Sequence, residues 1–237
     1  MARYTGARLK IVRRLKADLP GLTRKAIGLR KNPPGQHGAN ARKSSDYGIR
    51  LIEKQKVKYN YGLSEKTLRH YFSSASSSKN ETGKELMSLL ESRLDNVIFR
   101  AGFAPTIPAA RQLVCHGHVL VNGKRINYPG RSVVPGEVVS IREQSRKIPM
   151  VLETIDNPSL SLPTYLKVEA KAFTAEMTQR PQADDAPIEV QLNLIIELFS
   201  RVGLYLNTQA KQQSRLLTRA ALFVSILTTL PQKSINE

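Results

Sequence analysis

The sequence predicts an α+β fold in which helices precede a compact unit of helix, tight turn, helix and β-hairpin. Apolar side chains recur at three- and four-residue spacing over 86–98, which indicates an amphipathic helix. The alternation that begins at Val119 then leads into Asn122-Gly123, a pair that favours a type I′ hairpin turn. We therefore expect a mainly helical N-terminal part together with a small α/β module, a helix-turn-helix followed by a twisted hairpin.

The first elements are predicted from caps and breakers. A short helix is expected near Arg8–Leu15, within an otherwise irregular basic arm that Pro and Gly interrupt. The spacing of apolar residues predicts a second helix over 46–58. Ser64 is a good N-cap for a third helix over 65–74, and the serine run 73–78 is expected to be a linker or an exposed loop.

The next helices belong to the predicted module. One continuous helix is expected from about Gly83 to Ile98, with Gly102 as the residue that ends it. Thr106 is the expected cap of the following helix, and Pro108 fits its first turn. His116-Gly117 then ends this helix, with Ala110, Leu113 and Val114 facing inward.

Strands are predicted where apolar residues alternate. Val119–Val121 and 124–126 form the hairpin, and Val138–Ile141 follows a turn. The alternation of apolar residues over 189–199 favours a further strand. Beyond it, apolar residues at helical spacing predict a helix over 209–230, docked on a neighbouring protein or on the C-terminal strand region, with a frayed tail as the alternative.

The charge of the chain is strongly positive and uneven. Lys and Arg number 37 against 19 Asp and Glu, a formal net charge of +18. Residues 1–72 hold 18 of the basic residues and only 4 acidic ones, whereas 153–200 hold 3 basic and 8 acidic residues. Such an excess indicates a polyanionic partner, because Lys and Arg that neutralise phosphates release counterions. An anionic membrane surface is the rival partner.

Several classes of site are disfavoured. Cys115 is the single cysteine, so no internal disulfide can form. No secretory signal and no apolar stretch of membrane-spanning length is evident, so no membrane partner is expected. Cys115, His116 and His118 are too close together in the sequence to make a good tetrahedral metal site. The turn over 33–38 lacks the Gly-Lys-Ser/Thr ending of a P-loop. No Gly-x-Ser-x-Gly nucleophile elbow occurs. We expect neither metal nor cofactor.

The exposed polar residues of the module are typical of an RNA-docking surface. Thr106, the helix N-terminus that follows it and Arg111 are expected to form a phosphate site. Tyrosines interleaved with basic residues could stack on bases or pack between helices. The residues expected to contact RNA are Arg3, Arg13, Arg14, Arg24, Lys25, Gln36, His37, Arg50, Lys54, Lys56, Tyr61, Arg69, Arg93, Thr106, Arg111, Gln112, His116, His118, Asn122 and Lys124.

An enzymatic reading rests on Arg93-Leu94-Asp95, which is similar to the Gly-Arg-Leu-Asp motif of pseudouridine synthases. Here Ser92 takes the place of the glycine, and the residues are expected inside an amphipathic helix. Asp95 is therefore predicted to orient Arg93 or a backbone group, and no catalytic residue is expected.

The order and spacing of several motifs resemble the small-subunit ribosomal protein S4 family. The matching stretches are Leu19–Thr23, Pro33–Gly38, Arg50–Lys56, Tyr61–Glu65 and Arg93–Lys124. Residues 189–201 resemble the family's closing strand. Ile107-Pro108 is similar to cyanobacterial and plastid members, where common bacterial members have Arg in place of Ile107. The zinc-binding cysteines of some bacterial relatives are absent.

The resemblance implies a helical N-terminal domain with an inserted α/β RNA-binding module. The expected parts are a basic arm over 1–44, a helical part over 45–90 completed by 150–201, the module over 91–149, and a C-terminal extension over 202–237. It also implies a structural, non-enzymatic role in the small ribosomal subunit, with ribosomal RNA at a multi-helix junction and neighbouring ribosomal proteins as partners. Early assembly and a place near the messenger RNA entry path follow from the same resemblance.

The implied location is the ribosome of a plastid, the chloroplast stroma, with cyanobacterial cytoplasm as the alternative. Two other functions use the same module. An RNA-modifying enzyme would need a separate catalytic domain, for which residues 150–237 look too short and poor in motifs. A stand-alone RNA-binding regulator would differ in its failure to sediment with ribosomal subunits.

Overall fold

The computed structural model describes residues 4–25, 28, 32–38 and 45–200 of the chain. The chain forms two compact units, Met1–Ile196 and Glu197–Glu237. Only residues 197–200 of the second unit are among those described. The predictions for Arg3 and for a helix over 209–230 therefore lie outside the described residues.

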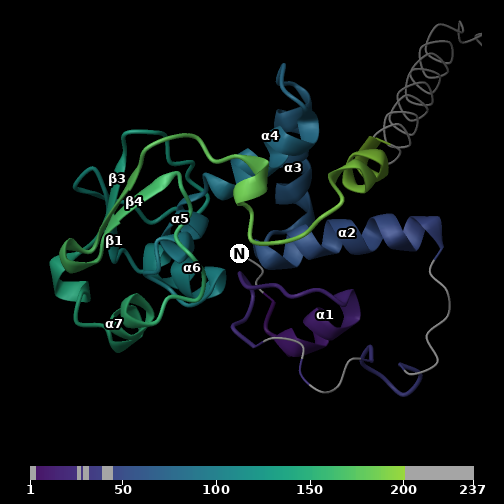
Figure 1. Cartoon of the computed structure of the whole chain (residues 1–237), viewed down its shortest axis with the longest axis horizontal. Coiled ribbons are helices and arrows are strands. Elements are labelled where there is room, and N and C mark those ends of the chain that lie inside the picture. The colour runs from purple at the N-terminus through teal and green to yellow at the C-terminus, as the bar shows by residue number, and fades with distance from the viewer. Residues whose placement is uncertain (1–3, 26–27, 29–31, 39–44, 201–237) are drawn as a thin grey trace, which may run out of the picture. The chain divides into compact units, whose positions relative to one another are not determined.

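Helices make up the first part of the first unit (Figure 1). They are α1 (Arg8–Leu15), α2 (Asp46–Asn60), α3 (Glu65–Ser76), α4 (Thr82–Glu91), α5 (Leu94–Arg100) and α6 (Ile107–Cys115). The later elements are β1 (Val119–Val121), β2 (Lys124–Arg125), β3 (Val138–Ile141), η1 (Glu143–Ser145), α7 (Pro149–Asp156), β4 (Leu166–Glu169), η2 (Ala170–Ala172), β5 (Thr174–Met177) and η3 (Ala183–Asp185). This is the predicted α+β class.

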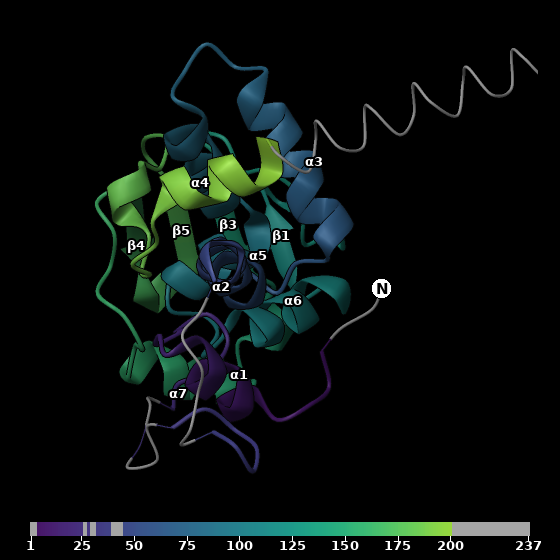
Figure 2. The same cartoon turned by 90° about the vertical axis from the view of Figure 1, so that its right-hand side faces the viewer.

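The strands form one antiparallel sheet in the order β2-β1-β3-β5-β4 (Figure 2). Leu120 pairs with Ser140, which joins the hairpin to β3, and Val139 pairs with Ala175, which joins β3 to β5. Two of these five strands thus come from 166–177, a stretch whose pattern predicted no element. The sheet extends the module beyond the expected 91–149.

The N-terminal helices confirm the predictions with one correction. Helices α1, α2 and α3 begin at the predicted residues, and the Ser64 hydroxyl, the predicted cap of α3, accepts a hydrogen bond from the Thr67 amide at 3.1 Å. However, α3 continues to Ser76, so the linker prediction for 73–76 is wrong. Ala75 is fully buried, and its burial stabilises the last turn of α3 despite the serines around it.

The predicted continuous helix over 83–98 is wrong, because it breaks between α4 and α5. Arg93 has extended backbone angles (φ −67°, ψ 140°). The Leu94 amide donates to the Arg131 carbonyl at 2.8 Å, and the Val133 amide donates to the Ser92 carbonyl at 2.8 Å. Pairing with the 129–133 loop replaces helical hydrogen bonds here. The three- and four-residue spacing of apolar residues continues across the break, because α4 and α5 both bury their apolar faces.

The end of α5 and the hairpin follow the prediction. Gly102, Gly117 and Gly123 have φ of +78°, +73° and +76°, and Asn122 has φ of +48°, as a type I′ turn at Asn122-Gly123 requires. Thr106 occupies the cap position of α6, but its side chain makes no capping bond. The Ile107 amide donates instead to the Gly21 carbonyl at 2.8 Å.

The strand predicted over 189–199 is wrong, because residues 192–200 are helical. The buried residues of this stretch are Ile195, Leu198 and Phe199. Their spacing of three and one is that of a helical face, whereas the alternation that suggested a strand includes half-buried positions. Leu192 and Ile196 pack closely against Gly83, the second residue of α4.

A small apolar core supports the N-terminal arm. Ile11, Val12 and Leu15 of α1 are buried with Leu19 and Leu22, and Ile52, Tyr59 and Ile188 pack against them. The Gly21 amide donates to the Asn60 side chain at 2.9 Å, next to the Gly21 bond to α6. Residues 19–22 therefore connect the end of α2 with the start of α6.

Candidate nucleic-acid interface

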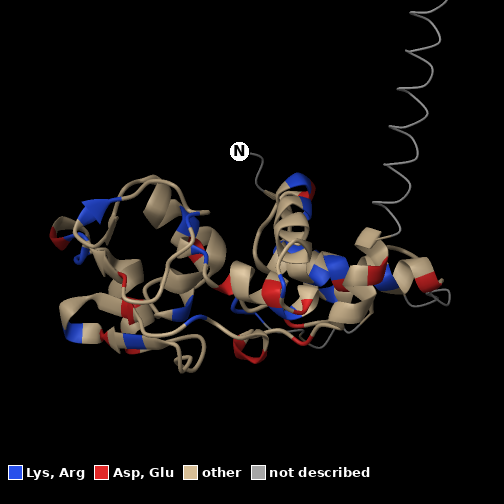
Figure 3. Cartoon of the chain, turned by 90° about the horizontal axis from the view of Figure 1, so that it is seen from above, with Lys and Arg blue, Asp and Glu red and all other residues tan. Residues whose placement is uncertain are grey.

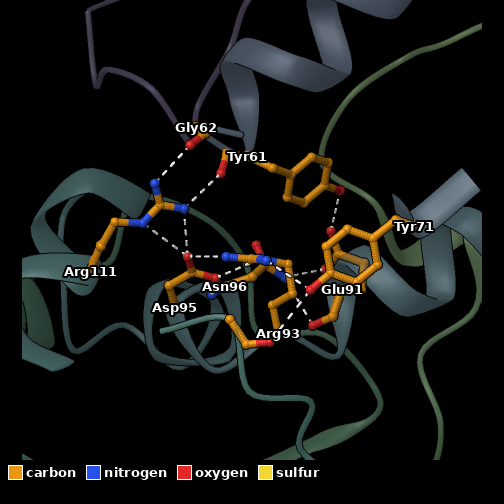
Figure 4. A network of polar contacts seen from close by, with 9 residues as sticks. Tyr61, Gly62, Tyr71, Glu91, Arg93, Asp95, Asn96 and Arg111 are labelled. Atoms are coloured by element: carbon orange, nitrogen blue, oxygen red, sulfur yellow. Dashed lines mark hydrogen bonds and ion pairs between the residues drawn. The ribbon is translucent and has the colours of Figure 1, made fainter. Parts of the chain in front are cut away.

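A buried ion cluster surrounds Asp95 in the first turn of α5 (Figure 4). Asp95 is fully buried and accepts from two nitrogens of Arg93, Nε at 3.0 Å and Nη2 at 2.7 Å. Arg111 of α6 donates to the same carboxylate at 2.8 Å. One carboxylate therefore pairs with two guanidinium groups from different segments.

This cluster also reaches the N-terminal helices. Arg111 NH1 donates to the Gly62 carbonyl at 2.7 Å, directly after α2. Arg93 NH1 donates to the Tyr71 hydroxyl of α3 at 2.8 Å. The bonds on Arg93 and Arg111 thus attach the module to the helical part, and they leave both guanidinium groups engaged inside the protein.

A second buried group, Glu91, lies at the end of α4. Tyr61 and Tyr165 donate their hydroxyls to its two oxygens at 2.5 and 2.9 Å, Asn96 donates at 2.8 Å, and Arg100 is paired at 3.8 Å. Burial raises the pKa of Glu91 against the opposing effect of these donors and of Arg100. Burial, followed by the Glu91 charge, raises the pKa of Tyr61 well above its ordinary value, so the phenol stays a donor.

These contacts decide two earlier questions. Asp95 does orient Arg93, as predicted, although the argument from a helix interior was wrong because the helix breaks at Ser92 and Arg93. Of the interleaved tyrosines, Tyr61 is buried, Tyr71 bonds Arg93, and Tyr59 packs on the α1 core. For these three tyrosines the packing alternative holds.

A groove of about 910 Å³ lies beside the ion cluster. Its walls are the segment from Tyr4 to Arg8, the end of α2 with the turn into α3, and one side of α6 from Thr106 to His116. Its polar lining includes Arg8, Lys58, Thr106, Arg111, Gln112 and His116. The groove brings together four predicted contact residues, of which Gln112 and His116 are exposed, Arg111 is half-buried and Thr106 is buried.

The predicted phosphate site at Thr106 and Arg111 therefore needs correction. Arg111 spends its donors on Asp95, Gly62 and Tyr61, and the first amide of α6 is bound to Gly21. Arg8 and Lys58 also line the groove, although they are not among the residues predicted to contact RNA. Their positions depend on how α1 and α2 pack, which the local sequence pattern does not indicate.

The hairpin end of the module holds the other predicted residues. Lys124 is exposed, and the Asn122 side chain accepts from the Val138 amide at 2.9 Å, so Asn122 supports the turn. His118 lies 2.8 Å from the Ser145 hydroxyl, and its ring is 6.0 Å from that of His116. Burial, then the charges of His116, Arg125 and Arg142, lower the pKa of His118.

The basic arm and α2 contribute both free and engaged cations. Arg13 donates to the Asn32 carbonyl at 2.9 Å, and Arg24 donates to the Ser159 hydroxyl at 2.9 Å. Lys54 and Lys56 form ion pairs of 2.6 Å with Glu65 and Glu53, and Arg50 is half-buried. Further exposed predicted residues are Arg14, Lys25, Gln36 and His37 in the arm, and Arg69 on α3.

Other kinds of site find no support in the described residues. Among them, no group of three His, Cys, Asp or Glu side chains is placed to hold a metal ion. No helix in the described ranges is both long and apolar enough to cross a membrane.

Figure 3 shows Lys and Arg on the ribbon of α2 and of the hairpin.

The fold and the groove define a basic α+β protein in which a helix-turn-helix and sheet module is fixed to a helical part through buried ion pairs. The family described as "Ribosomal protein S4/S9 N-terminal domain" matches residues 3–91, and the "S4 domain" family matches residues 92–139. The helix-turn-helix and hairpin therefore fall within the S4 domain match.

Curated relatives extend this match over most of the chain. The small ribosomal subunit protein uS4 of Methylobacillus flagellatus is 50% identical over 202 residues, 84% of this chain and 98% of the relative. The protein uS4B of Nitrosomonas europaea is 49% identical over 84% and 98%, and uS4 of the cyanobacterium Thermosynechococcus vestitus is 46% identical over 85% and 99%. The chain belongs to the small ribosomal subunit protein uS4 family, whose members are ribosomal proteins and not enzymes.

Proposed function

We propose that this protein is a structural constituent of the small ribosomal subunit that binds small-subunit ribosomal RNA. The observation that carries the proposal is 50% identity to a small-subunit protein over 98% of that relative's length. The net charge of +18 supports it, because a phosphate backbone is the partner that such a surplus favours.

The RNA-contacting surface is proposed from the exposed part of the predicted residues. Gln112 and His116 in the groove, Lys124 on the hairpin, and the free cations of the arm and α3 are accessible to phosphates. Four of the predicted residues are buried and support the fold: Lys54, Tyr61, Arg93 and Thr106. The half-buried Arg111 links Asp95 of the module to the Gly62 carbonyl of the helical part. Affinity then comes mainly from phosphates, and RNA shape provides the specificity.

Sedimentation with ribosomal subunits tests this function. The full-length protein is expected to sediment with small subunits in a sucrose gradient and to remain bound after a high-salt wash. Release into the top fractions at high salt would instead support a stand-alone regulator that binds RNA only transiently.

We further propose binding at a multi-helix junction, a role early in assembly and a position near the messenger RNA entry path. The family membership supports these assignments. Footprinting of small-subunit ribosomal RNA should show protections from several helices that converge. Order-of-addition reconstitution should show that omission of this protein blocks the binding of later proteins, and protections confined to one hairpin would contradict the junction.

A plastid ribosome is the proposed location, with cyanobacterial cytoplasm as the alternative. Ile107-Pro108, which is similar to cyanobacterial and plastid members, supports this placement. Mass spectrometry of ribosomes purified from plastids and from the surrounding cytoplasm would decide it. Recovery only from the cytoplasmic ribosomes of a plastid-containing cell would overturn the plastid assignment.

The organisation that we propose follows the predicted parts, with one change. The arm over 1–44, the helical part over 45–90 and the module over 91–149 remain, and the strands over 166–177 are assigned to the module because they complete its sheet. The extension over 202–237 is a separate part. Limited proteolysis should release the arm and the extension first and leave 166–177 attached to the module.

A further inference from the structure

Four positively charged or titratable side chains gather where α6, β2 and β3 end. His116 closes α6, His118 precedes β1, Arg125 ends β2, and Arg142 follows β3. The rings of His116 and His118 are 6.0 Å apart, and Arg125 NH2 donates to the His116 carbonyl at 3.2 Å. The Arg142 amide donates to the His118 carbonyl at 2.9 Å. Backbone and side-chain contacts thus fix all four residues at one place.

Glycine makes this arrangement possible. Gly117 separates the two histidines, has φ of +73° and is buried. The Arg125 guanidinium lies over its Cα, where any Cβ would collide with it. A side chain at position 117 would therefore expel Arg125 from its place beside His116.

The cluster lacks a compensating carboxylate among the described residues. The charges that act on His118 are those of His116, Arg125 and Arg142, and all of them disfavour its protonation. Glu143 on η1 and Arg146 after it are the other charged groups of the adjoining turn, and Glu143 makes no ion pair with a described residue. Ser145, which faces His118 at 2.8 Å, is neutral. Mutual repulsion of this kind is relieved when an anion binds.

We propose that His116, His118, Arg125 and Arg142 form a proton-linked clamp for a backbone phosphate of the bound RNA. This inference rests on the proposed function and adds Arg125 and Arg142 to the contact surface. The two arginines supply permanent charge and planar donors suited to phosphate oxygens. The negative charge of a phosphate favours the imidazolium form of a neighbouring histidine, so phosphate binding at this cluster is linked to proton uptake.

The sign of the pH dependence follows from this linkage. In the free protein the pKa of His118 is lowered, first by burial and then by its cationic neighbours, so His118 is mostly neutral near pH 7. A bound phosphate raises that pKa, so the complex holds more protons than the free protein. RNA affinity therefore rises as pH falls through the histidine range, by at most about tenfold per pH unit for each linked proton.

The experiment measures binding of the full-length protein to a transcript of small-subunit ribosomal RNA between about pH 5.5 and 8 at fixed ionic strength. Wild type should bind more tightly at the acidic end, and calorimetry in buffers of different ionisation enthalpy should show net proton uptake. His116→Gln and His118→Gln should each reduce the uptake, and the double variant should nearly abolish it. His70→Gln, which changes an exposed histidine on α3, is the matched control.

Arg142→Gln separates the clamp from a folding effect, since Arg142 is exposed and its side chain can be changed without opening the core. It should weaken RNA binding and leave the melting temperature unchanged. If His118→Gln lowers the melting temperature through loss of the Ser145 contact, His116→Gln and Arg142→Gln still decide the proposal. Equal proton uptake in wild type and in His116→Gln, together with unchanged affinity for Arg142→Gln, would overturn it.

Two further outcomes keep the proposals distinct. RNA binding that persists with no proton uptake removes the clamp and leaves the proposed function intact, whereas absence of RNA binding at every pH contradicts the function itself. Inorganic phosphate at millimolar concentration, without RNA, should produce far less uptake than the transcript. Full uptake with inorganic phosphate alone would assign the site to the free anion and not to RNA.

Discussion

The ion cluster around Asp95 and the clamp around His118 use the same kinds of side chain under opposite conditions. In the first, Arg93 and Arg111 share one fully buried carboxylate. In the second, Arg125 and Arg142 lie exposed beside two histidines without a described carboxylate. Of these four arginines, the two that share an internal acid support the fold, and the two without one are those proposed to contact RNA.

The largest effect is expected from Asp95→Ala. This change leaves Arg93, which is 4% exposed, and Arg111 without their carboxylate. Removal of one partner from a buried ion pair costs about 3–5 kcal/mol of the free energy of unfolding. Urea denaturation measures it. Glu81→Gln, which breaks the exposed pair with Lys84, is the control and should not shift the midpoint.

A comparable but purely apolar effect is expected next to this cluster. Leu94→Ala should lower the free energy of unfolding by about 2–5 kcal/mol, because the side chain is fully buried at the start of α5. Urea denaturation of the same preparation measures the loss. A change well below this range would mean that the α4–α5 break is looser than the contacts at Ser92 and Leu94 indicate.

Arg111→Ala tests whether Arg111 supports the fold or contacts RNA. From the sequence alone this variant was expected to weaken RNA binding without loss of stability. The bonds to Asp95 and to the Gly62 carbonyl now predict a loss of about 1–3 kcal/mol as well. Gln112→Ala, on the exposed neighbour that also lines the groove, should leave the melting temperature unchanged. Equal melting temperatures for the two variants would return Arg111 to the RNA-contacting class.

The smaller effect of Glu91→Gln depends on pH. Burial raises the folded-state pKa of Glu91, so folding favours the protonated form. Its contribution is fully present below the unfolded pKa of about 4.3 and is lost as pH rises through the folded pKa. Wild type should therefore lose stability relative to Glu91→Gln as pH rises from about 4 through the raised folded-state pKa of Glu91. Denaturation curves across that range measure the difference, and an opposite slope would mean that Arg100 and the tyrosines outweigh burial.

Local features of the fold could be predicted because they depend on neighbours in sequence. The Ser64 cap, the Asn122-Gly123 turn and the glycine ends of α5 and α6 are all present. The break at Arg93 could not be predicted, since it depends on pairing with residues 129–133, nearly forty positions away. The helix over 192–200 was missed because alternating and helical spacing overlap in a short apolar run.

The candidate site was predictable in composition and not in detail. The sequence located the module and its polar residues, and Asp95 beside Arg93 indicated one internal pair. It did not show which of the other polar residues are exposed, as Lys124 is, and which are buried, as Thr106 is. Arg8, Lys58, Arg125 and Arg142 join the site only through tertiary packing. The role of a basic residue thus depended on whether a buried carboxylate lay within hydrogen-bond distance of it, and only for Arg93 does that carboxylate lie close in the sequence.

Lys124→Ala gives the smallest change and tests the exposed class at its simplest. Lys124 is exposed on the hairpin, and the turn beside it is held by Asn122 and Gly123, so its loss should alter the free energy of unfolding by less than about 0.5 kcal/mol. One phosphate contact fewer should instead reduce the slope of log affinity against log salt by about 1. RNA binding by wild type and by Lys124→Ala, measured at several salt concentrations, gives the two slopes to compare. An unchanged slope with unchanged stability would show that exposure alone does not make a cation part of the RNA surface, and an added condition, such as the clustering seen at His118, would then be required.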